Sequence, residues 1–321
     1  MTFAKRIFSK KQSEEDHQEG KSAYKYNKFF HILCHAILIL LSLAAILPFL
    51  LLFSSSLTDE GALMRYGYFF IPRVFSLQAY EFLFVTNVNN IMRAYGISFF
   101  VTFTGTSLSL LIAPALAYPL SRSDYPRRRI VLFFVFFTML FNGGLVPQYI
   151  MWTQVFGLRN HILALIFPNL LMNGFIIMLL KNNFQTNIHP ALIEAAKIDG
   201  AGEFFIYRKI VLPLSLPILA TVGLMVAVGY WNDWMNGLYY ISDPRLFSLQ
   251  QLLNTILMNI QAIVSMADVG VGADLAAALA DMPSIGIRMA MAVIGVIPIM
   301  VLYPFFQKYF IKGLSLGGVK E

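Results

Sequence analysis

Long runs without a charged side chain alternate with short polar segments along most of this 321-residue chain. A membrane-spanning helix needs about 20 mostly apolar residues. Runs of about that length lie at 29–58, 94–121, 130–158, 160–180, 210–232, 246–267 and 289–307. The pattern therefore predicts a protein built largely from apolar helices that cross a membrane.

One of the seven runs differs from the others because amide side chains interrupt it. The amides of run 246–267 are Gln250, Gln251, Asn254, Asn259 and Gln261. An amide in hydrocarbon needs a hydrogen-bond partner from the protein itself. We therefore expect this run to form an amphipathic or re-entrant external helix, which leaves six spans.

The Lys and Arg side chains gather in the segments that six spans would place on one side of the membrane. The segments before the first span and after the second, fourth and sixth spans hold 18 of the 24 Lys and Arg residues. Cytoplasmic loops carry an excess of these residues. Both ends are therefore expected in the cytoplasm, with a polar tail at 1–28, a six-span domain at 29–310 and a tail at 311–321.

The composition agrees with the apolar runs and excludes several classes of protein. Hydrophobic residues make up 58% of the chain and charged residues 13%, whereas a soluble domain has about 25% charged residues. An ordinary soluble enzyme, a disordered chain and a coiled coil are excluded. The lone Cys34 excludes a disulfide framework and a cysteine-rich metal site. We expect no metal site and no nucleic-acid partner, and we expect membrane lipid to face the basic run 127–129.

The most informative polar segment is the loop at 182–213, between the fourth and fifth spans. A helix is expected to begin at Pro190, because proline is tolerated in a first turn. Good helix-forming residues continue to Asp199, and Gly200 ends the helix. A second short helix is expected to follow and to stop at Pro213.

One face of the first helix combines apolar and small side chains. Leu192, Ala195, Ala196 and Asp199 follow the i, i+3, i+4, i+7 spacing of a single helical face. Small side chains let another surface approach closely, which suits a docking face. Glu194 is expected in the first turn, where the helix dipole favours a carboxylate. Composition alone leaves open an amphipathic helix that lies on the membrane without a protein partner.

The spacing of the loop resembles the EAA loop of permease subunits in bacterial ABC importers. Three residues separate Glu194, Ala195 and Ala196 from Gly200, and nine more separate Gly200 from the closing Ile-Val-Leu-Pro at 210–213. In that family the loop forms a coupling helix that docks in a cleft of the cytoplasmic ATPase. The ATPase-contacting residues that the resemblance implies are Leu192, Glu194, Ala195, Ala196, Asp199, Gly200, Leu212 and Pro213.

Four further stretches are similar to the smaller, second permease of the maltose-type carbohydrate branch. They lie at 117–122, 141–147, 229–234 and 312–320. Within this branch the chain most resembles permeases of complex oligosaccharides derived from plant or algal polysaccharides. The resemblance covers about 29–321 and implies an all-α type I ABC importer permease fold, with six spans and both termini cytoplasmic.

The resemblance also implies what the chain works with. It would be a multi-pass transport subunit of the bacterial inner membrane and not an enzyme. Its partners would be a second homologous permease, two ABC ATPase subunits, an extracytoplasmic solute-binding protein and an oligosaccharide. No cofactor is expected on this chain, because the ATPase subunits bind ATP and Mg²⁺. In the family's second permease the tail reaches the ATPases, which implies contacts from Lys312, Gly313 and Leu314.

Polar and aromatic residues of the third, fourth and fifth spans are candidates for the path of a sugar. Ligand pockets combine apolar walls with a few polar groups, and sugars stack on aromatic rings and bond to amides and carboxylates. The candidates are Tyr230, Asn232, Asp233 and Asn142, with Gln148, Asn169 and Asn173 as weaker ones. The aromatic residues around Asp233 also fit an interfacial belt.

Three alternatives remain open on the residues alone. An ABC permease for a non-sugar solute would carry the same loop. An ion-coupled secondary transporter usually has several ionisable residues within the membrane. An intramembrane aspartyl enzyme needs two carboxylates that share a site, and Asp233 is the one candidate here.

Overall fold

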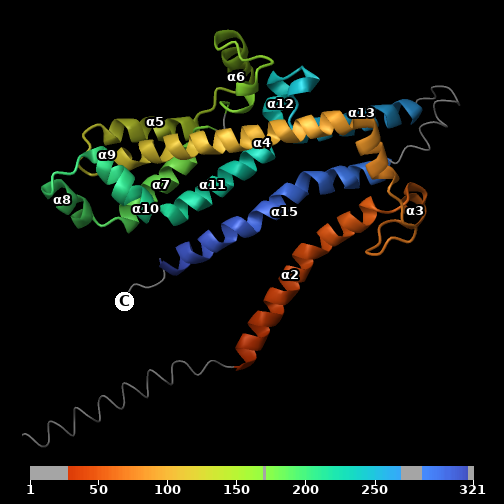
Figure 1. Cartoon of the computed structure of the whole chain (residues 1–321), viewed down its shortest axis with the longest axis horizontal. Coiled ribbons are helices and arrows are strands. Elements are labelled where there is room, and N and C mark those ends of the chain that lie inside the picture. Colours follow the sequence, from red (N-terminus) through yellow and green to blue (C-terminus); the bar gives the residue numbers. More distant parts are fainter. Residues whose placement is uncertain (1–27, 169–170, 269–283, 317–321) are drawn as a thin grey trace, which may run out of the picture.

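The computed structural model describes residues 28–168, 171–268 and 284–316. These residues form helices joined by short loops, with one isolated antiparallel bridge between Thr58 and Phe75 (Figure 1). The expected all-α architecture is confirmed for this part of the chain.

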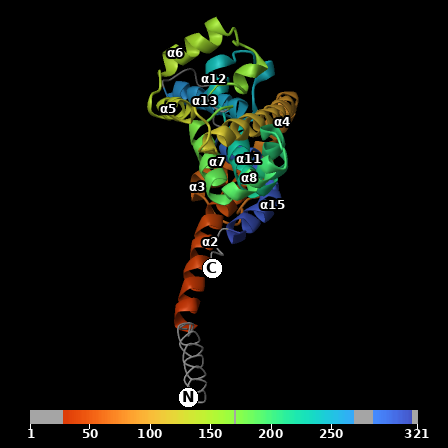
Figure 2. The same ribbon diagram turned by 90° about the vertical axis from the view of Figure 1, so that its left-hand side faces the viewer.

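Three long apolar helices set the length of the molecule. They are α2 (Lys28–Ser56), α4 (Gln78–Ser121) and α15 (Ser284–Leu316). Figure 2 shows α2 extending away from the remaining helices, and none of its most apolar 18-residue stretch is buried. The side chains of α2 are therefore available to lipid or to another protein surface.

The segment between the first two predicted spans is partly helical. It contains the short helix α3 (Glu60–Tyr66), and α4 already begins at Gln78. α4 thus begins 16 residues before the expected span at 94–121, and its part that is apolar enough to cross a membrane is Val88–Ser121. Glu81 and Arg93 lie within this extension, so the charge-free run of α4 begins only at Ala94.

Two further helix pairs are apolar enough to cross a membrane but are sharply bent. α5 (Arg128–Leu140) and the segment of α6 (Leu145–Ile150) and η1 (Met151–Val155) meet at 113°. The segment Glu203–Leu214 meets α11 (Leu216–Trp231) at 80°. The described residues therefore hold three membrane-crossing helices, or up to five if each bent pair is one span.

The breaks in these pairs have local causes. The run at 130–158 is interrupted after α5, where Gly144 has φ +85°, a conformation that side chains with a β-carbon rarely adopt. The pair that includes α11 breaks at Ser215, between Pro213 and Pro217. Proline lacks the backbone N–H that continues a helix.

The run at 160–180 does not form one long helix. It contains the 3-10 turn η2 (Ile162–Leu165), Pro168, and the first half of α7 (Gly174–Asn187). The Asn173 side chain accepts a 2.9 Å hydrogen bond from the Phe175 N–H and so starts α7 afresh. The fourth predicted span is therefore not a single helix. The number of six spans remains a prediction.

The amide-rich run at 246–267 forms α13 (Leu249–Asp268). It is not among the helices apolar enough to cross a membrane, in agreement with the expectation that it is no span. The Gln251 side chain is buried and donates to the Ile241 carbonyl at 3.3 Å. Leu249 and Leu253 of the same helix are also buried.

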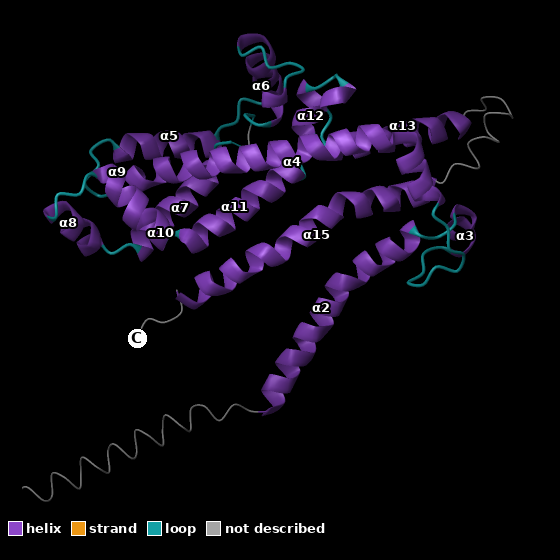
Figure 3. Ribbon diagram, in the orientation of Figure 1, coloured by secondary structure: helices purple, strands orange, loops and turns teal. Residues whose placement is uncertain are grey.

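The main core lies between α4, α7 and α11, which run side by side (Figure 3). Tyr230 of α11 is buried, and its hydroxyl donates to the Ile166 carbonyl at 2.8 Å. A smaller core joins the first half of α4 to α13 and α15, and it includes the buried Trp231 ring. The two cores hold the loop at 182–213 and the helix breaks in fixed positions.

Candidate functional site

The expected helix of the loop at 182–213 is present as α8 (Pro190–Ile198). Its N-cap is His189, whose Nδ1 accepts a hydrogen bond from the Ala191 N–H at 3.3 Å. The helix ends at Asp199 and Gly200, and Gly200 has φ +80°. This left-handed conformation is the usual end of a helix at glycine, so both predicted ends of the helix are confirmed to within a residue.

The predicted docking face of α8 lies at the surface. Ile193 anchors the helix in the main core, with 8% of its surface exposed. Leu192, by contrast, is 49% exposed, and Ala195 and Asp199 are exposed as well. Ala196 is half-buried against the core. The face is therefore open to a partner.

Glu194 also lies on the exposed surface of α8, but it is the fifth residue of the helix. Its expected place in the first turn is wrong, because a helix that starts at Pro190 completes its first turn at Ile193. The effect of the helix dipole falls off within the first turn, so the dipole argument does not apply to this carboxylate.

The second helix of the loop continues past the predicted stop at Pro213. α9 (Glu203–Ile206) leads into the π-helix η3 (Tyr207–Val211) and then α10 (Leu212–Leu214). Pro213 occupies the first turn of α10, where its missing N–H is tolerated. Leu212 and Pro213 therefore lie just before the 80° bend into α11, not at the end of an isolated helix.

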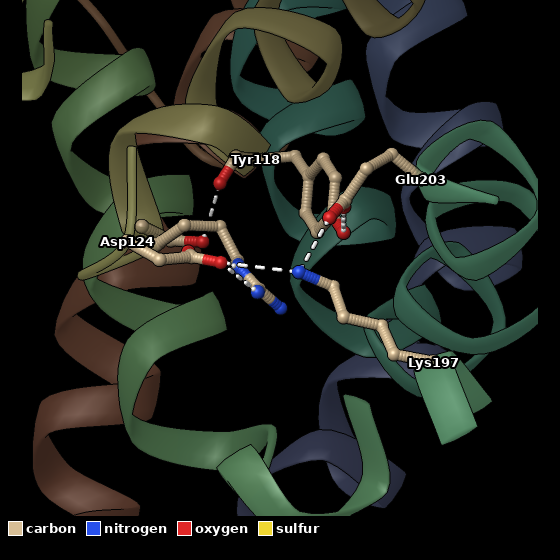
Figure 4. A network of polar contacts seen from close by, with 6 residues as sticks. Tyr118, Asp124, Lys197 and Glu203 are labelled. Carbon is tan, nitrogen blue, oxygen red and sulfur yellow. Dashed lines mark hydrogen bonds and ion pairs between the residues drawn. The ribbon is translucent and has the colours of Figure 1, made fainter. Parts of the chain in front are cut away.

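A network of polar side chains surrounds the C-terminal end of α8 (Figure 4). Lys197 Nζ lies 3.1 Å from Asp124 Oδ2 and 2.8 Å from Glu203 Oε1. Asp124 also accepts two hydrogen bonds from the Arg122 guanidinium, at 2.6 and 2.9 Å. The Tyr118 hydroxyl donates to Glu203 Oε2 at 2.5 Å. The network joins the end of α4, the following loop, α8 and α9.

The network shifts the titration of its members. Hydrogen bonds from Arg122 hold the pKa of the Asp124 carboxyl well below its usual value. Hydrogen bonds from Lys197 and Tyr118 lower the pKa of Glu203, and those to Glu203 and Asp124 raise the pKa of Lys197. All four charged groups are therefore ionised at neutral pH.

Sequence reasoning missed this network. Arg122 and Lys197 were counted only among the basic residues that indicate topology, and no role was predicted for Asp124 or Glu203. Asp124 and Lys197 are 73 positions apart, and no local spacing marks such a pair. The one available signal was the presence of Asp124 and Glu203 within segments that are otherwise rich in Lys and Arg.

A cleft of about 700 Å³ lies at the break between α5 and α6. Asn142, Gln148 and Asn173 line it together with the half-buried Trp152. Asn142 Oδ1 accepts hydrogen bonds from the Gly144 N–H at 2.9 Å and from Gln148 Nε2 at 3.3 Å. The cleft thus combines three amides with aromatic and apolar walls, which is the composition expected of a ligand pocket.

The candidates of the fifth span lie elsewhere. The Tyr230 hydroxyl donates to the Ile166 carbonyl within the core. Asp233 Oδ1 accepts a hydrogen bond from the Asn236 N–H at 3.2 Å. Asn232 is exposed and lines a separate cleft of about 330 Å³ with Gln250 and the α15 helix. A role of these residues in the substrate path remains a prediction.

Two predictions fall at the edge of the described residues. Asn169 lies outside them, as do residues 1–27 and 317–321. Lys312, Gly313 and Leu314 lie near the end of α15, which continues to Leu316. In the part of the chain that the structure describes, no group of three His, Cys, Asp or Glu side chains could hold a metal ion.

The exposed helix α8 and the bundle of apolar helices agree with one protein family. The profile of the family described as "Binding-protein-dependent transport system inner membrane component" matches residues 93–316. The chain belongs to this family. It is therefore a multi-pass permease component of an ABC transporter in the inner membrane, and not an enzyme, as the sequence predicted.

Individual relatives match over nearly the whole chain. The "Polygalacturonan/rhamnogalacturonan transport system permease protein YtcP" of Bacillus subtilis (strain 168) is 38% identical over 92% of this chain and 99% of its own. "Protein LplC" of the same organism is 38% identical over 86% of this chain and 89% of its own. Family membership sets aside the secondary transporter and the intramembrane enzyme.

A solved structure has the same fold. It is described as a bacterial ABC transporter involved in the import of the acidic polysaccharide alginate. One of its chains superimposes with a TM-score of 0.71 and 29% sequence identity, over 89% of this chain and 98% of that chain. The predicted type I permease fold is therefore confirmed. A permease of an ABC importer in general works with ATPase subunits, a partner permease and a solute-binding protein.

Proposed function

We propose that this chain is the smaller of two homologous permeases, and that their complex with two ABC ATPase subunits imports oligosaccharides of acidic polysaccharides. Support for the substrate class comes from a relative named for polygalacturonan and rhamnogalacturonan and a structural neighbour that imports alginate. Both names refer to polymers rich in uronic acids. ATP and Mg²⁺ would be bound by the ATPase subunits, and a solute-binding protein would deliver the sugar.

The proposed topology has six spans with both termini in the cytoplasm. The spans would be α2, α4 from Val88 onward, the α5–α6 pair, α7 with the segment before it, the segment 210–232 that contains α11, and α15. The distribution of Lys and Arg supports it. In this arrangement α8 lies in the cytoplasm, and the break at 141–144 lies within the membrane.

The coupling role is proposed for the exposed face of α8. Leu192, Ala195 and Asp199 would contact the ATPase, and Glu194 would pair with one of its cationic side chains. Gly200 would supply the turn that ends α8. The exposure of Leu192, which leaves about half of this residue (49%) uncovered, supports this proposal because apolar residues at a docking face are buried on assembly.

The observation that carries the substrate proposal is the cleft at the α5–α6 break. Amides within the membrane are tolerated where they face protein or a water-filled cavity. Asn142, Gln148 and Asn173 have N–H groups that can donate to hydroxyls and carboxylates, and Trp152 can stack on a sugar ring. No acidic side chain is among the described residues that line the cleft, so a uronate would meet no like charge.

A charge placed in the cleft tests both the site and the substrate class. We would reconstitute the complete complex in liposomes and measure uptake of oligogalacturonates, alginate oligosaccharides and neutral oligosaccharides. The variant Gln148→Glu is expected to lower uptake of the acidic sugars by about tenfold or more, because two like charges would meet in a poorly solvated cleft. Neutral sugars should lose much less.

Two controls separate the added charge from other effects. Gln148→Leu removes the amide without adding charge and should reduce all sugars alike. Gln154→Glu adds the same charge to the same bent segment, at an exposed position that does not line the cleft, and should change little. Equal loss of acidic and neutral sugars in Gln148→Glu would overturn the uronate proposal. Uptake of a non-sugar solute alone would overturn the carbohydrate assignment.

A further inference from the structure

The coupling helix α8 connects to the rest of the chain through two short backbone links. On one side Ile188 and His189 join it to α7, and on the other Asp199 to Gly202 join it to α9. Neither link is helical, so each can act as a hinge. The main apolar anchor of the helix is Ile193, in its first half. A further contact must hold the second half of α8 if movement of this helix is to be transmitted to the apolar helices.

Lys197, in the last turn of α8, makes that second attachment. Its ammonium group lies between two carboxylates that belong to different segments, Asp124 of the α4–α5 loop and Glu203 at the start of α9. Figure 4 shows the Lys197 side chain reaching across from α8 toward Asp124 and Glu203. One side chain therefore connects α8 to both of its neighbours.

Both carboxylates are in turn fixed to the end of α4. Asp124 is held by Arg122 through two hydrogen bonds from the guanidinium. Glu203 is held by the Tyr118 hydroxyl, one helical turn before Arg122. The contacts close a ring from α4 through Asp124 to Lys197, and back through Glu203 to α4. A closed ring restrains rotation of α8 about its links, which a single ion pair would not do.

We propose that Lys197 is a positioning residue that makes α8 and the cytoplasmic end of α4 move as one body, so that movement of the docked ATPase is transmitted to the membrane helices. This inference rests on the proposed coupling role of α8. It predicts that loss of Lys197 uncouples ATP hydrolysis from transport without removing any group from the exposed docking face. α4 is the recipient because it packs along α7 and α11 in the main core.

The competing explanation is a set of surface ion pairs with no mechanical role. Asp124 and Glu203 are more than half exposed, and Lys197 is 39% exposed. Single exposed pairs contribute little to stability, whereas networks and bidentate Arg contacts contribute more. Stability alone therefore cannot distinguish the two explanations, and the test needs a readout of coupling.

The test uses the complete complex in liposomes, with its solute-binding protein and substrate. The measured quantity is the ratio of stimulated to basal ATPase rate, together with sugar uptake per ATP hydrolysed. In Lys197→Met this ratio is expected to fall by about threefold to tenfold, since two charge-assisted contacts are lost. Lys197→Arg keeps the charge and should retain most of the ratio.

A double-mutant cycle tests whether Lys197 acts through Asp124. Asp124→Asn lies outside α8 and should lower the ratio in the same way, and the double variant should be no worse than the more severe single variant. The matched control is Lys209→Met, which removes an exposed lysine of the same loop that makes no ion pair within the described residues. It should behave as wild type.

The outcomes separate this inference from the proposed function. A wild-type complex without stimulation by any loaded binding protein would refute the proposed function itself. A stimulated wild type with Lys197→Met unchanged would overturn the inference alone, and so would effects of Lys197→Met and Asp124→Asn that multiply. If Lys197→Met fails to assemble, Asp124→Asn decides, because a normal ratio in that variant contradicts the closed ring.

Discussion

The ring of Tyr230 occupies the space that a β-carbon on Gly105 would need. Gly105 lies on α4 and Tyr230 on α11, and these two helices pack closely in the main core. The tyrosine hydroxyl reaches past the glycine to the Ile166 carbonyl. One missing side chain thus allows the close approach of two spans and fixes the segment that follows η2.

This relationship predicts the effect of a single methyl group. Gly105→Ala should lower the free energy of unfolding by about 1–3 kcal/mol, because an overpacked core forces side chains or backbone to move. Gly96→Ala is the matched control, since Gly96 is also on α4 and has open space around its Cα. It should be neutral or stabilising by up to about 1 kcal/mol.

The measurement is thermal unfolding of the purified complex in detergent, followed for both variants. A lower midpoint for Gly105→Ala than for Gly96→Ala is expected. Equal midpoints would show that α4 and α11 do not approach as closely as the packing of Tyr230 requires.

The sequence predicted the elements whose determinants are local. The helix α8 was predicted from Pro190 and Gly200, which mark its two ends. The residues of the predicted docking face are exposed, as docking requires, and their role in docking remains a prediction. The amide-rich run was recognised as no span because each amide has a desolvation penalty that can be judged from one residue.

The parts that the sequence did not predict depend on contacts between distant residues. The ring around Lys197 needs Asp124 and Tyr118, which come from another helix end and have no periodic relation to it. The 113° bend after α5 needs a backbone path that apolar composition does not specify. The cleft amides were named singly, but only the bend brings Asn142, Gln148 and Asn173 together.

A second prediction concerns the start of α15. The Glu60 carboxylate accepts hydrogen bonds from the Ile285 and Gly286 N–H groups, both at 2.9 Å, and Glu60 is 8% exposed. It thereby caps a helix more than 200 positions away. Glu60→Gln should cost about 1–2 kcal/mol, because the negative charge interacts favourably with the N-terminal end of the helix and binds two of its free donors.

Hydrogen exchange followed by mass spectrometry provides the measurement for this cap. The peptide that begins at 285 should exchange faster in Glu60→Gln, while peptides from α7 should not change. Glu81→Gln is the control, since Glu81 is exposed and its side chain makes no hydrogen bond within the described residues. Unchanged exchange at 285 would contradict the capping role.

A third prediction follows from the acidic groups of the network. The pKa values of Asp124 and Glu203 are lowered in the folded protein, from ordinary values of 3.8 and 4.5. A lowered pKa means that the ionised form stabilises the fold above the ordinary value, and that this contribution is lost as the pH falls through the folded value. The network should therefore be intact at pH 7 and weaken below about pH 4.

The difference in unfolding midpoint between wild type and Asp124→Asn reports this contribution. It should be largest at pH 6–7 and shrink progressively below about pH 4, as the wild-type carboxylates become protonated. Lys209→Met should show no such pH-dependent difference. A difference that grows as the pH falls would have the wrong sign for an Asp124 that is stabilised as the anion.

The last prediction concerns the turn that ends α8, the proposed coupling helix. Gly200 has φ +80°, and a β-carbon built on it would meet no other atom within 4 Å. Any penalty for a side chain at this position is therefore conformational and not steric crowding from neighbours. For Gly200→Ala this penalty is about 1–2 kcal/mol, because L-residues other than Asn and Asp disfavour the left-handed region.

Gly202→Ala separates this effect from a general sensitivity of the loop. Gly202 also has open space around it, but its φ is −72°, which alanine adopts freely. In the complete complex, Gly200→Ala should lower the ratio of stimulated to basal ATPase rate, whereas Gly202→Ala should leave it close to wild type. If the turn at Gly200 sets the direction of the lever, Gly200→Asn should retain more coupling than Gly200→Ala, since Asn tolerates a positive φ. The order Gly, Asn, Ala would identify backbone conformation as the property on which coupling depends, and equal coupling in all three would contradict it.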